Sequence, residues 1–162
     1  MNFADTNWLA SAYIEPQADD DEAVRRRELI ERFMRRYGGQ LVISHPVLLE
    51  ARNIFSRITG EREPREWQTL EADFDGRLYV DPMNWDILRR ECNALFSKYA
   101  WKAAIGTFDT LIIASVKLAG GTRFLSFDAT ARAIAAAEGI EVYPALDLSE
   151  KQLASRLKHK GK

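Results

Sequence analysis

The sequence predicts an α/β protein in which a parallel sheet is covered by helices on both faces. Short apolar segments, typical of buried strands, alternate along the chain with longer segments whose apolar residues recur at helical spacing. Such alternation favours a parallel sheet with helical connections. The 162 residues are 46% hydrophobic and 29% charged, which suits one globular domain with a sizeable core.

Five segments are expected to be strands because they are short, apolar and bounded by polar or turn-forming residues. They are residues 1–4 (MNFA), 41–44 (LVIS), 77–82 (RLYVDP), 123–126 (RFLS) and 140–144 (IEVYP). In a parallel sheet the functional sites collect at the carboxyl ends of the strands. Side chains that directly follow these strands are therefore the first candidates for a site.

The intervening segments have helical spacing and recognisable start and stop signals. The expected helices are residues 6–14, 22–37, 46–58, 65–74, 84–100, 108–119 and 128–138. Asp20 or Asp21, Asn84 and Thr107 are the expected N-caps, and Pro46 lies in a first turn, where proline is tolerated. Glycines end three of the helices, at residues 38–39, 120–121 and 139.

The last segment, residues 149–162, is expected to form a basic tail helix that follows a domain of residues 1–148. Ser149 and Gln152 are expected to form its capping box. Its basic side chains include Arg156, Lys158, His159, Lys160 and Lys162. The tail is one candidate for contact with nucleic acid.

Four carboxylates interrupt or end apolar segments. Asp5 ends the first strand segment, and Asp128 ends RFLSFD. Glu50 interrupts HPVLLEARNIF, and Asp109 interrupts TFDTLIIASVKLA. An ionised carboxylate is costly to bury unless it is paired or bound to a cation. The pattern therefore predicts a shared acidic pocket that holds a divalent cation through oxygen ligands.

Each of the four acids also has an ordinary structural interpretation. Asp5 and Asp128 are placed to cap the helices that follow them. Asp109 is a first-turn acid, which the helix dipole favours, and Glu50 can be a partly exposed helix residue. Their recurrence at matching ends of successive units favours a common site over four separate structural roles.

Four motifs occur in order across nearly the whole chain: FADTNWL, SHPVLLEARN, FDTLIIASVKLAGG and FLSFDATA. This ordered set resembles the PIN-domain ribonucleases, in particular the toxin halves of bacterial VapBC-type toxin–antitoxin pairs. The resemblance implies a three-layer α/β/α sandwich with a mainly parallel central sheet. It also implies endonucleolytic cleavage of RNA that depends on Mg²⁺ or Mn²⁺.

The resemblance also assigns residues and partners. Asp5, Glu50, Asp109 and Asp128 match the acidic quartet of the family, as catalytic and metal-binding residues. Asn7 matches a polar position near the site, and Ser126 matches a small hydroxyl residue that supports it. A small antitoxin is the expected protein partner, and a homodimer is the expected assembly.

The chain also departs from the family pattern near the site. Ala131 stands where many of these toxins carry an aromatic residue, and WKAAIGTF lacks the Arg often seen before the third acid. Lys102 or Lys117 is a candidate for the missing cation. These differences leave the metal ligands in place but affect the expected contacts with the substrate.

RNA binding requires cations, and the net charge of −1 means that they must be local. The richest basic segment is RRRELIERFMRR, residues 25–36, although Glu28 with Arg32 and Glu31 with Arg35 have the spacing of helical ion pairs. A solvated, ion-paired face is therefore the simpler interpretation. Trp8 is a candidate for stacking on bases, or a core residue.

The sequence disfavours two other enzyme or signalling folds and leaves one alternative to a ribonuclease. A haloacid-dehalogenase-like phosphatase needs a second Asp two residues after the first, where this chain has Asn7. A response-regulator receiver domain needs an acidic pair near its phosphoacceptor strand, and Asp81 is followed directly by Pro82. A non-catalytic PIN-like RNA-binding or scaffold module is the remaining alternative, and such a module is expected to have lost some of the acids.

Composition also bears on the compartment. Cys92 is the only cysteine, so no disulfide can form within the chain, which fits a reducing compartment. The first residues lack the pattern of a signal peptide, and the longest apolar run, LIIASVKLAG, is too short to span a bilayer. The protein is therefore expected to be cytoplasmic, with no membrane association.

Overall fold

A computed structural model describes residues 1–159, and the side chain of Asp75 is not described. The central sheet has five parallel strands in the order β3-β2-β1-β4-β5. The strands are β1 (Asn2–Ala4), β2 (Leu41–Ile43), β3 (Leu78–Val80), β4 (Arg123–Leu125) and β5 (Glu141–Tyr143). All five lie where the sequence predicts strands, and the parallel α/β/α architecture is confirmed.

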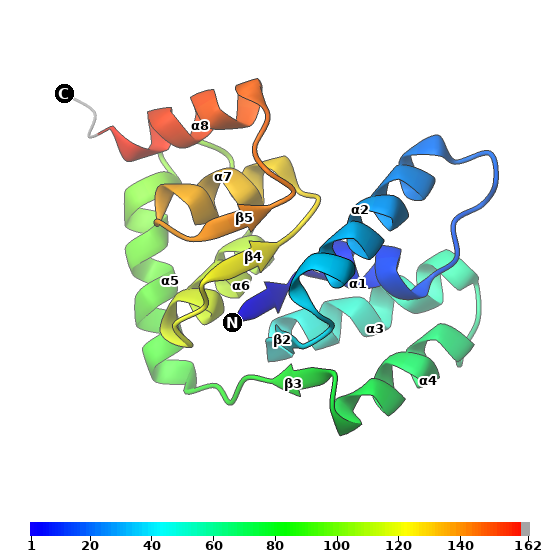
Figure 1. Ribbon diagram of the computed structural model, residues 1–162. Coiled ribbons are helices and arrows are strands. Elements are labelled where there is room, and N and C mark those ends of the chain that lie inside the picture. The colour runs from blue at the N-terminus through cyan, green and yellow to red at the C-terminus, as the bar shows by residue number, and fades with distance from the viewer. Residues whose placement is uncertain (160–162) are drawn as a thin grey trace.

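The helices fill the connections between the strands (Figure 1). They are α1 (Thr6–Tyr13), α2 (Asp21–Tyr37), α3 (His45–Thr59), α4 (Arg65–Ala72), α5 (Trp85–Tyr99), α6 (Thr107–Leu118), α7 (Ala129–Ala137) and α8 (Leu148–Lys158). A short 3-10 turn, Asp73–Asp75, follows α4, so the regular helix ends slightly earlier than predicted. No helix within residues 1–159 is long and apolar enough to cross a membrane.

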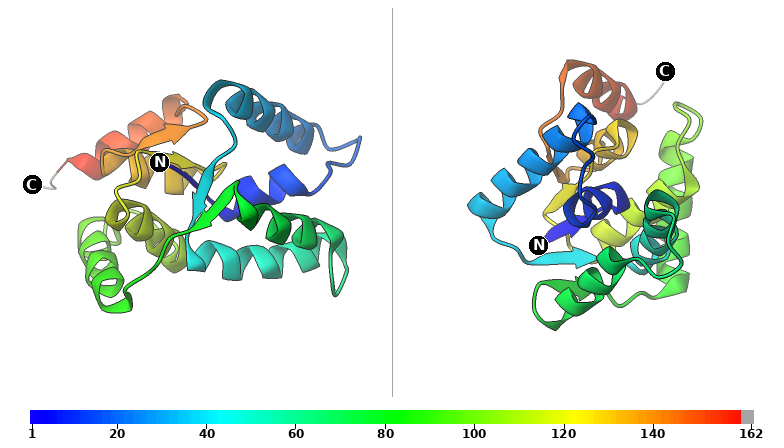
Figure 2. Two further views of the ribbon diagram at one scale, coloured as in Figure 1. Left: turned by 60° about the horizontal axis from the view of Figure 1, so that its bottom comes forward. Right: turned by 90° about the vertical axis from the view of Figure 1, so that its right-hand side faces the viewer.

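The helices lie in layers on the two sides of the sheet. Figure 2 shows α2 on one side and α3, α5 and α6 on the other. On the α2 side, the Tyr143 hydroxyl of β5 donates a 3.2 Å hydrogen bond to the Leu29 carbonyl. On the opposite side, Phe3 of β1 and Val116 of α6 pack so closely around Gly121 that an added Cβ would lie 2.6 Å from Val116 and 2.8 Å from Phe3.

The order of the strands places the site. From β1 the chain moves to β2 and β3 on one side, and then returns to β4 and β5 on the other. The position between β1 and β4 is therefore the switch point of the sheet, where ligands bind in open α/β folds. The register pairs Ala4 with Leu125, so the residues after these two strands start side by side.

Two predicted caps are wrong. Thr107 is the first residue of α6, and the N-cap is Gly106, which makes no side-chain cap. The capping box of α8 is formed by Asp147 and Glu150 rather than by Ser149 and Gln152, because the helix begins earlier and an Asp precedes it. The predicted caps Asp20 and Asn84 are confirmed.

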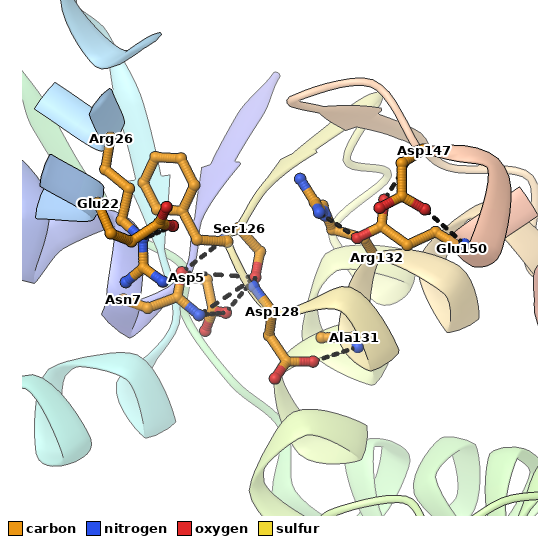
Figure 3. Close-up of polar contacts among 11 residues, drawn as sticks. Asp5, Asn7, Glu22, Arg26, Ser126, Asp128, Ala131, Arg132, Asp147 and Glu150 are labelled. Atoms are coloured by element: carbon orange, nitrogen blue, oxygen red, sulfur yellow. Dashed lines mark hydrogen bonds and ion pairs between the residues drawn. The ribbon is translucent and has the colours of Figure 1, made fainter. Parts of the chain in front are cut away.

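The segment expected to be a tail helix is packed on the domain. Ala154 and Leu157 of α8 are buried. A buried ion pair joins Arg132 of α7 to Glu150 of α8, which Figure 3 shows beside Asp147. The predicted basic residues Lys160 and Lys162 lie outside the described residues.

Candidate functional site

Asp5 lies at the centre of the site, immediately after β1. Its side chain is almost completely buried, with 3% of the residue exposed. The Ser126 hydroxyl donates to Asp5 at 2.7 Å, and the Asn7 amide donates to the same oxygen at 2.9 Å. The second oxygen of Asp5 accepts from the Thr6 backbone N–H at 2.8 Å, so Asp5 is also the N-cap of α1.

Burial raises the pKa of the Asp5 carboxyl from 3.8 to about 6. Hydrogen bonds from Ser126 and from the Thr6 N–H oppose this rise, because they stabilise the ionised form. The negative charges of Asp109 and Glu50 add to it. These two acids, distant in sequence, therefore lie within electrostatic reach of Asp5.

Asn7 and Ser126 connect the ends of β1 and β4. The Asn7 side-chain carbonyl accepts from the Phe127 N–H at 2.8 Å, while its amide group donates to Asp5. The Ser126 oxygen also accepts from the Asp128 N–H at 3.0 Å. Figure 3 shows this set of contacts between the two strand ends. The geometry fixes the orientation of the Asp5 carboxylate.

Glu50 reaches the site from the second turn of α3. Its carboxylate accepts a short hydrogen bond from the Thr6 hydroxyl. Thr6 is buried, whereas Glu50 is half-buried. The position of Thr6, directly after the first acid, is the only sequence signal for this role, and the four motifs do not indicate it.

Asp109 lies in the first turn of α6 and is half-buried. Burial raises the pKa of its carboxyl, and the charges of Asp128 and Glu50 raise it further. The carboxylate packs against Gly106, where an added Cβ would clash with Oδ2 and lie 3.3 Å from Cγ. Within residues 1–159 its side chain makes no hydrogen bond, unlike that of Asp5.

Asp128 is the N-cap of α7. One carboxylate oxygen accepts from the Ala131 N–H at 2.6 Å (Figure 3). Its other oxygen has no hydrogen-bond donor in the described part of the chain. The predicted structural roles of Asp5, Asp128 and Asp109 are thus real, and they exist alongside the gathering of the acids.

All four acids line one open cleft of about 900 Å³, together with Thr6 and Asn7. Within the described residues, no three His, Cys, Asp or Glu side chains are clustered tightly enough to hold a metal ion together. The donor set nevertheless fits a hard divalent cation. Mg²⁺ prefers carboxylate oxygens and keeps several waters, so that one or two direct protein ligands are enough. A cation would also offset the negative charges of Asp109 and Glu50, which add to the effect of burial on the pKa of Asp5.

The cations that were expected near the site lie elsewhere. Lys117 pairs with Glu138 at 2.5 Å and with Glu91, and Lys102 donates to the carbonyls of Leu157 and His159. Both lysines are therefore wrong as substrate-binding candidates. Trp8 is a core residue with no exposed surface.

One cation in the cleft was not singled out from the sequence. Arg26 of α2 lines it, beside Glu22. In the sequence Arg26 is one of six arginines in a single amphipathic segment, and nothing local distinguishes it from the others. Its position is a consequence of tertiary packing.

Comparisons with known proteins identify a family model and structures with a similar fold. The family model of the PIN domain matches residues 3–137. A search of curated proteins finds no match. Among solved structures, VapC20 of Mycobacterium tuberculosis, described as a Sarcin-Ricin loop cleaving toxin, has a TM-score of 0.62 and 16% identity, over 82% of this chain and 94% of that chain.

Two further structures have the same fold. FitAcB from Neisseria gonorrhoeae has a TM-score of 0.58 and 14% identity, over 88% of this chain and 96% of that chain. FitAB bound to an IR36 DNA fragment has a TM-score of 0.59 and 16% identity, over 88% and 94% of the two chains. At these identities the likeness concerns the fold.

Proposed function

Because the chain belongs to the PIN domain family, we propose that it is a divalent-metal-dependent endoribonuclease that hydrolyses phosphodiester bonds of RNA. The observation that carries the proposal is the gathering of Asp5, Glu50, Asp109 and Asp128 on one cleft. These acids come from four separate segments of the chain. Packing alone gives no reason for four carboxylates to share a partly buried cleft.

In this proposal the four acids hold Mg²⁺ or Mn²⁺, directly or through water. Such a cation stabilises the negative charge that develops on an attacked phosphate and helps to activate water. Asn7 and Ser126 are positioning residues, since both hydrogen-bond to Asp5 and hold its carboxylate at the strand end. Thr6 has the same role for Glu50.

The biological role that we propose is that of the toxin in a type II toxin–antitoxin pair. The fold shared with VapC20, described as a Sarcin-Ricin loop cleaving toxin, supports this role. A small antitoxin is then the protein partner, and a homodimer is the proposed assembly. A ribonuclease acts where RNA is present, so we place its activity in the cytoplasm.

A second candidate is a non-catalytic PIN-like module that binds RNA or serves as a scaffold. The capping roles of Asp5 and Asp128 favour it, because they give two of the acids a structural function without any metal. Asp109 distinguishes the two candidates. Its carboxylate has a raised pKa and caps no helix, so its structural role is limited to the favourable position of an acid in the first turn of α6.

The test is cleavage of a panel of end-labelled RNAs with Mg²⁺ or Mn²⁺, with and without EDTA, by the wild type and by Asp109→Asn. The nuclease predicts metal-dependent fragments with 5′-phosphate and 3′-hydroxyl ends, which the variant does not produce. Equal cleavage by both proteins would rule this site out. Metal binding without cleavage of any RNA would favour the scaffold.

A further inference from the structure

The cleft that holds the four acids is lined mostly by negative charges. Nine carboxylates line it, and Arg26 is the only cation among the described residues that do so. A phosphate approaching this surface is repelled unless cations compensate. We propose that Arg26 binds a phosphate group of the RNA substrate, a proposal that rests on the function proposed above.

Packing holds Arg26 close to the acids. Its guanidinium lies over the ring of Phe127, 5.3 Å from the centroid. Phe127 in turn stacks on the buried Trp8, with centroids 5.2 Å apart and an interplanar angle of 16°. Phe127 stands between Ser126 and Asp128 in the chain, so the aromatic stack fixes the cation relative to the acids.

The guanidinium keeps donors for a ligand. Its Nε donates to Glu22 at 2.9 Å, and among residues 1–159 no other acceptor contacts it. Both terminal amino groups therefore remain for a phosphate, which matches the planar fork of Arg. Figure 3 shows Glu22 and Arg26 reaching from α2 to the side of the cleft where Asn7 lies.

The ion pair with Glu22 does not cancel this role. The side chain of Glu22 is 62% exposed and that of Arg26 is 35% exposed, and such surface pairs contribute little stability. Glu22 contacts only the Nε of the guanidinium and leaves its two terminal amino groups open. Removing the Glu22 charge should therefore strengthen the attraction of Arg26 for a phosphate.

Arg36 offers a matched comparison on the same helix. It also lies over an aromatic ring, that of Tyr37, at 5.1 Å from the centroid. It does not line the cleft. Replacing either arginine with alanine changes the net charge equally, so a difference between the two variants reports position rather than charge.

The competing explanation is that Arg26 only stabilises the packing of α2 against the segment that contains Phe127. A purely structural role affects the stability of the fold, whereas a phosphate contact also changes the salt dependence of RNA binding. Each phosphate contact with a single strand adds about 0.7 unit to the slope of log K against log salt concentration. The slope is therefore the measurement that separates the two roles.

The experiment measures binding of a fluorescent single-stranded RNA by anisotropy between 50 and 200 mM salt, in the Asp109→Asn background to prevent cleavage. We expect Arg26→Ala to bind roughly tenfold more weakly at low salt, with a slope about 0.7 unit smaller. Arg36→Ala should retain the affinity and slope of its parent. Glu22→Gln should bind more tightly, and Arg26→Lys should keep the slope. Thermal unfolding of each variant confirms that it is folded.

An Arg26→Ala protein that binds RNA as Arg36→Ala does would overturn the proposal. Loss of affinity with an unchanged slope, or no RNA binding by the parent at 50 mM salt, would overturn it as well. The proposed function fails by a different result, since absence of cleavage of any RNA by the wild type would remove it without altering the binding comparison.

Discussion

The Ser126 hydroxyl donates a 2.7 Å hydrogen bond to the Asp5 carboxylate, and this contact joins two strand ends that are 121 residues apart in the chain. Asp5 is held by further donors from Asn7 and from the Thr6 backbone. Asp109 shares the cleft with Asp5 but has no such donor within the described chain. Substitutions that neutralise Asp5 or Asp109 should therefore change the stability of the protein differently.

Asp109→Asn is expected to stabilise the metal-free protein. The substitution removes repulsion from Asp128 and Glu50 and breaks no side-chain hydrogen bond of the described residues. Each kcal/mol gained raises the melting temperature by about 2–4 °C in a chain of this size. The measurement is thermal unfolding at pH 8 in EDTA.

Asp86→Asn is the control for this substitution. Asp86 is also a first-turn acid, on α5, but it is exposed and paired with Arg89. Its loss should leave the melting temperature almost unchanged. A lower melting temperature for Asp109→Asn would show that the acids do not repel one another.

Gly106→Ala is expected to damage the site without damaging the fold. The added Cβ meets the flexible end of Asp109, so the carboxylate must turn away while the backbone stays. Binding of Mn²⁺, measured by calorimetry, should weaken although the melting temperature stays within a few degrees of the wild type.

Gly121→Ala, in contrast, is expected to destabilise the fold. Its Cβ would lie 2.6 Å from Val116 and 2.8 Å from Phe3, and neither core side chain can move freely. Overpacking of this kind costs about 1–3 kcal/mol of folding stability.

Equal Mn²⁺ affinity in Gly106→Ala and the wild type would mean that Asp109 takes no part in binding the ion.

Thr6→Val tests whether the Thr6 hydroxyl positions Glu50. Valine keeps the shape of the buried side chain but removes the donor to the Glu50 carboxylate. We expect weaker Mn²⁺ binding and a loss of about 1 kcal/mol in the free energy of unfolding. Thr6→Ser retains the hydroxyl and should restore Mn²⁺ binding. If both variants bind Mn²⁺ equally, the hydrogen bond has no role in the site.

Metal binding is expected to depend on pH through Asp5. Burial raises the pKa of Asp5 to about 6, so the folded protein holds a proton there that the unfolded chain has already lost. This contribution to stability is complete below pH 3.8, the unfolded value, and is lost as the pH rises through 6. A divalent cation competes with that proton.

The increase in melting temperature on addition of Mg²⁺ should therefore be largest above pH 7. Below pH 6 the affinity should fall by roughly tenfold per pH unit, because one proton must leave for each ion bound. Thermal unfolding with and without Mg²⁺ between pH 5 and pH 8 measures this difference. An increase in melting temperature that is as large at pH 5 as at pH 8 would contradict the role of Asp5.

Much of the fold follows from local patterns. The strand segments are short and apolar, and Asp5 and Asp128 lie within two residues of the ends of predicted strands, so a shared edge of the sheet is predictable from topology. Thr107 and Ser149 were misassigned as caps because several capping residues compete near each helix start. Gly106 and Asp147 take those positions instead.

The features of the site that the sequence does not predict depend on contacts between distant segments. Arg26 resembles its neighbours in sequence, and only the ring of Phe127 beneath it gives it a distinct place. Lys117 was a candidate for the site, but Glu138 and Glu91 bind it on another surface. The packing of Asp109 against Gly106 likewise has no signature in a single sequence.

Anomalous X-ray diffraction from a crystal grown with Mn²⁺ would locate the ion in the structure. We expect an anomalous peak in the cleft beside Asp5 and Asp109, and no such peak in the Asp109→Asn protein. A peak away from the acids, or none in a protein that still cleaves RNA, would contradict this expectation.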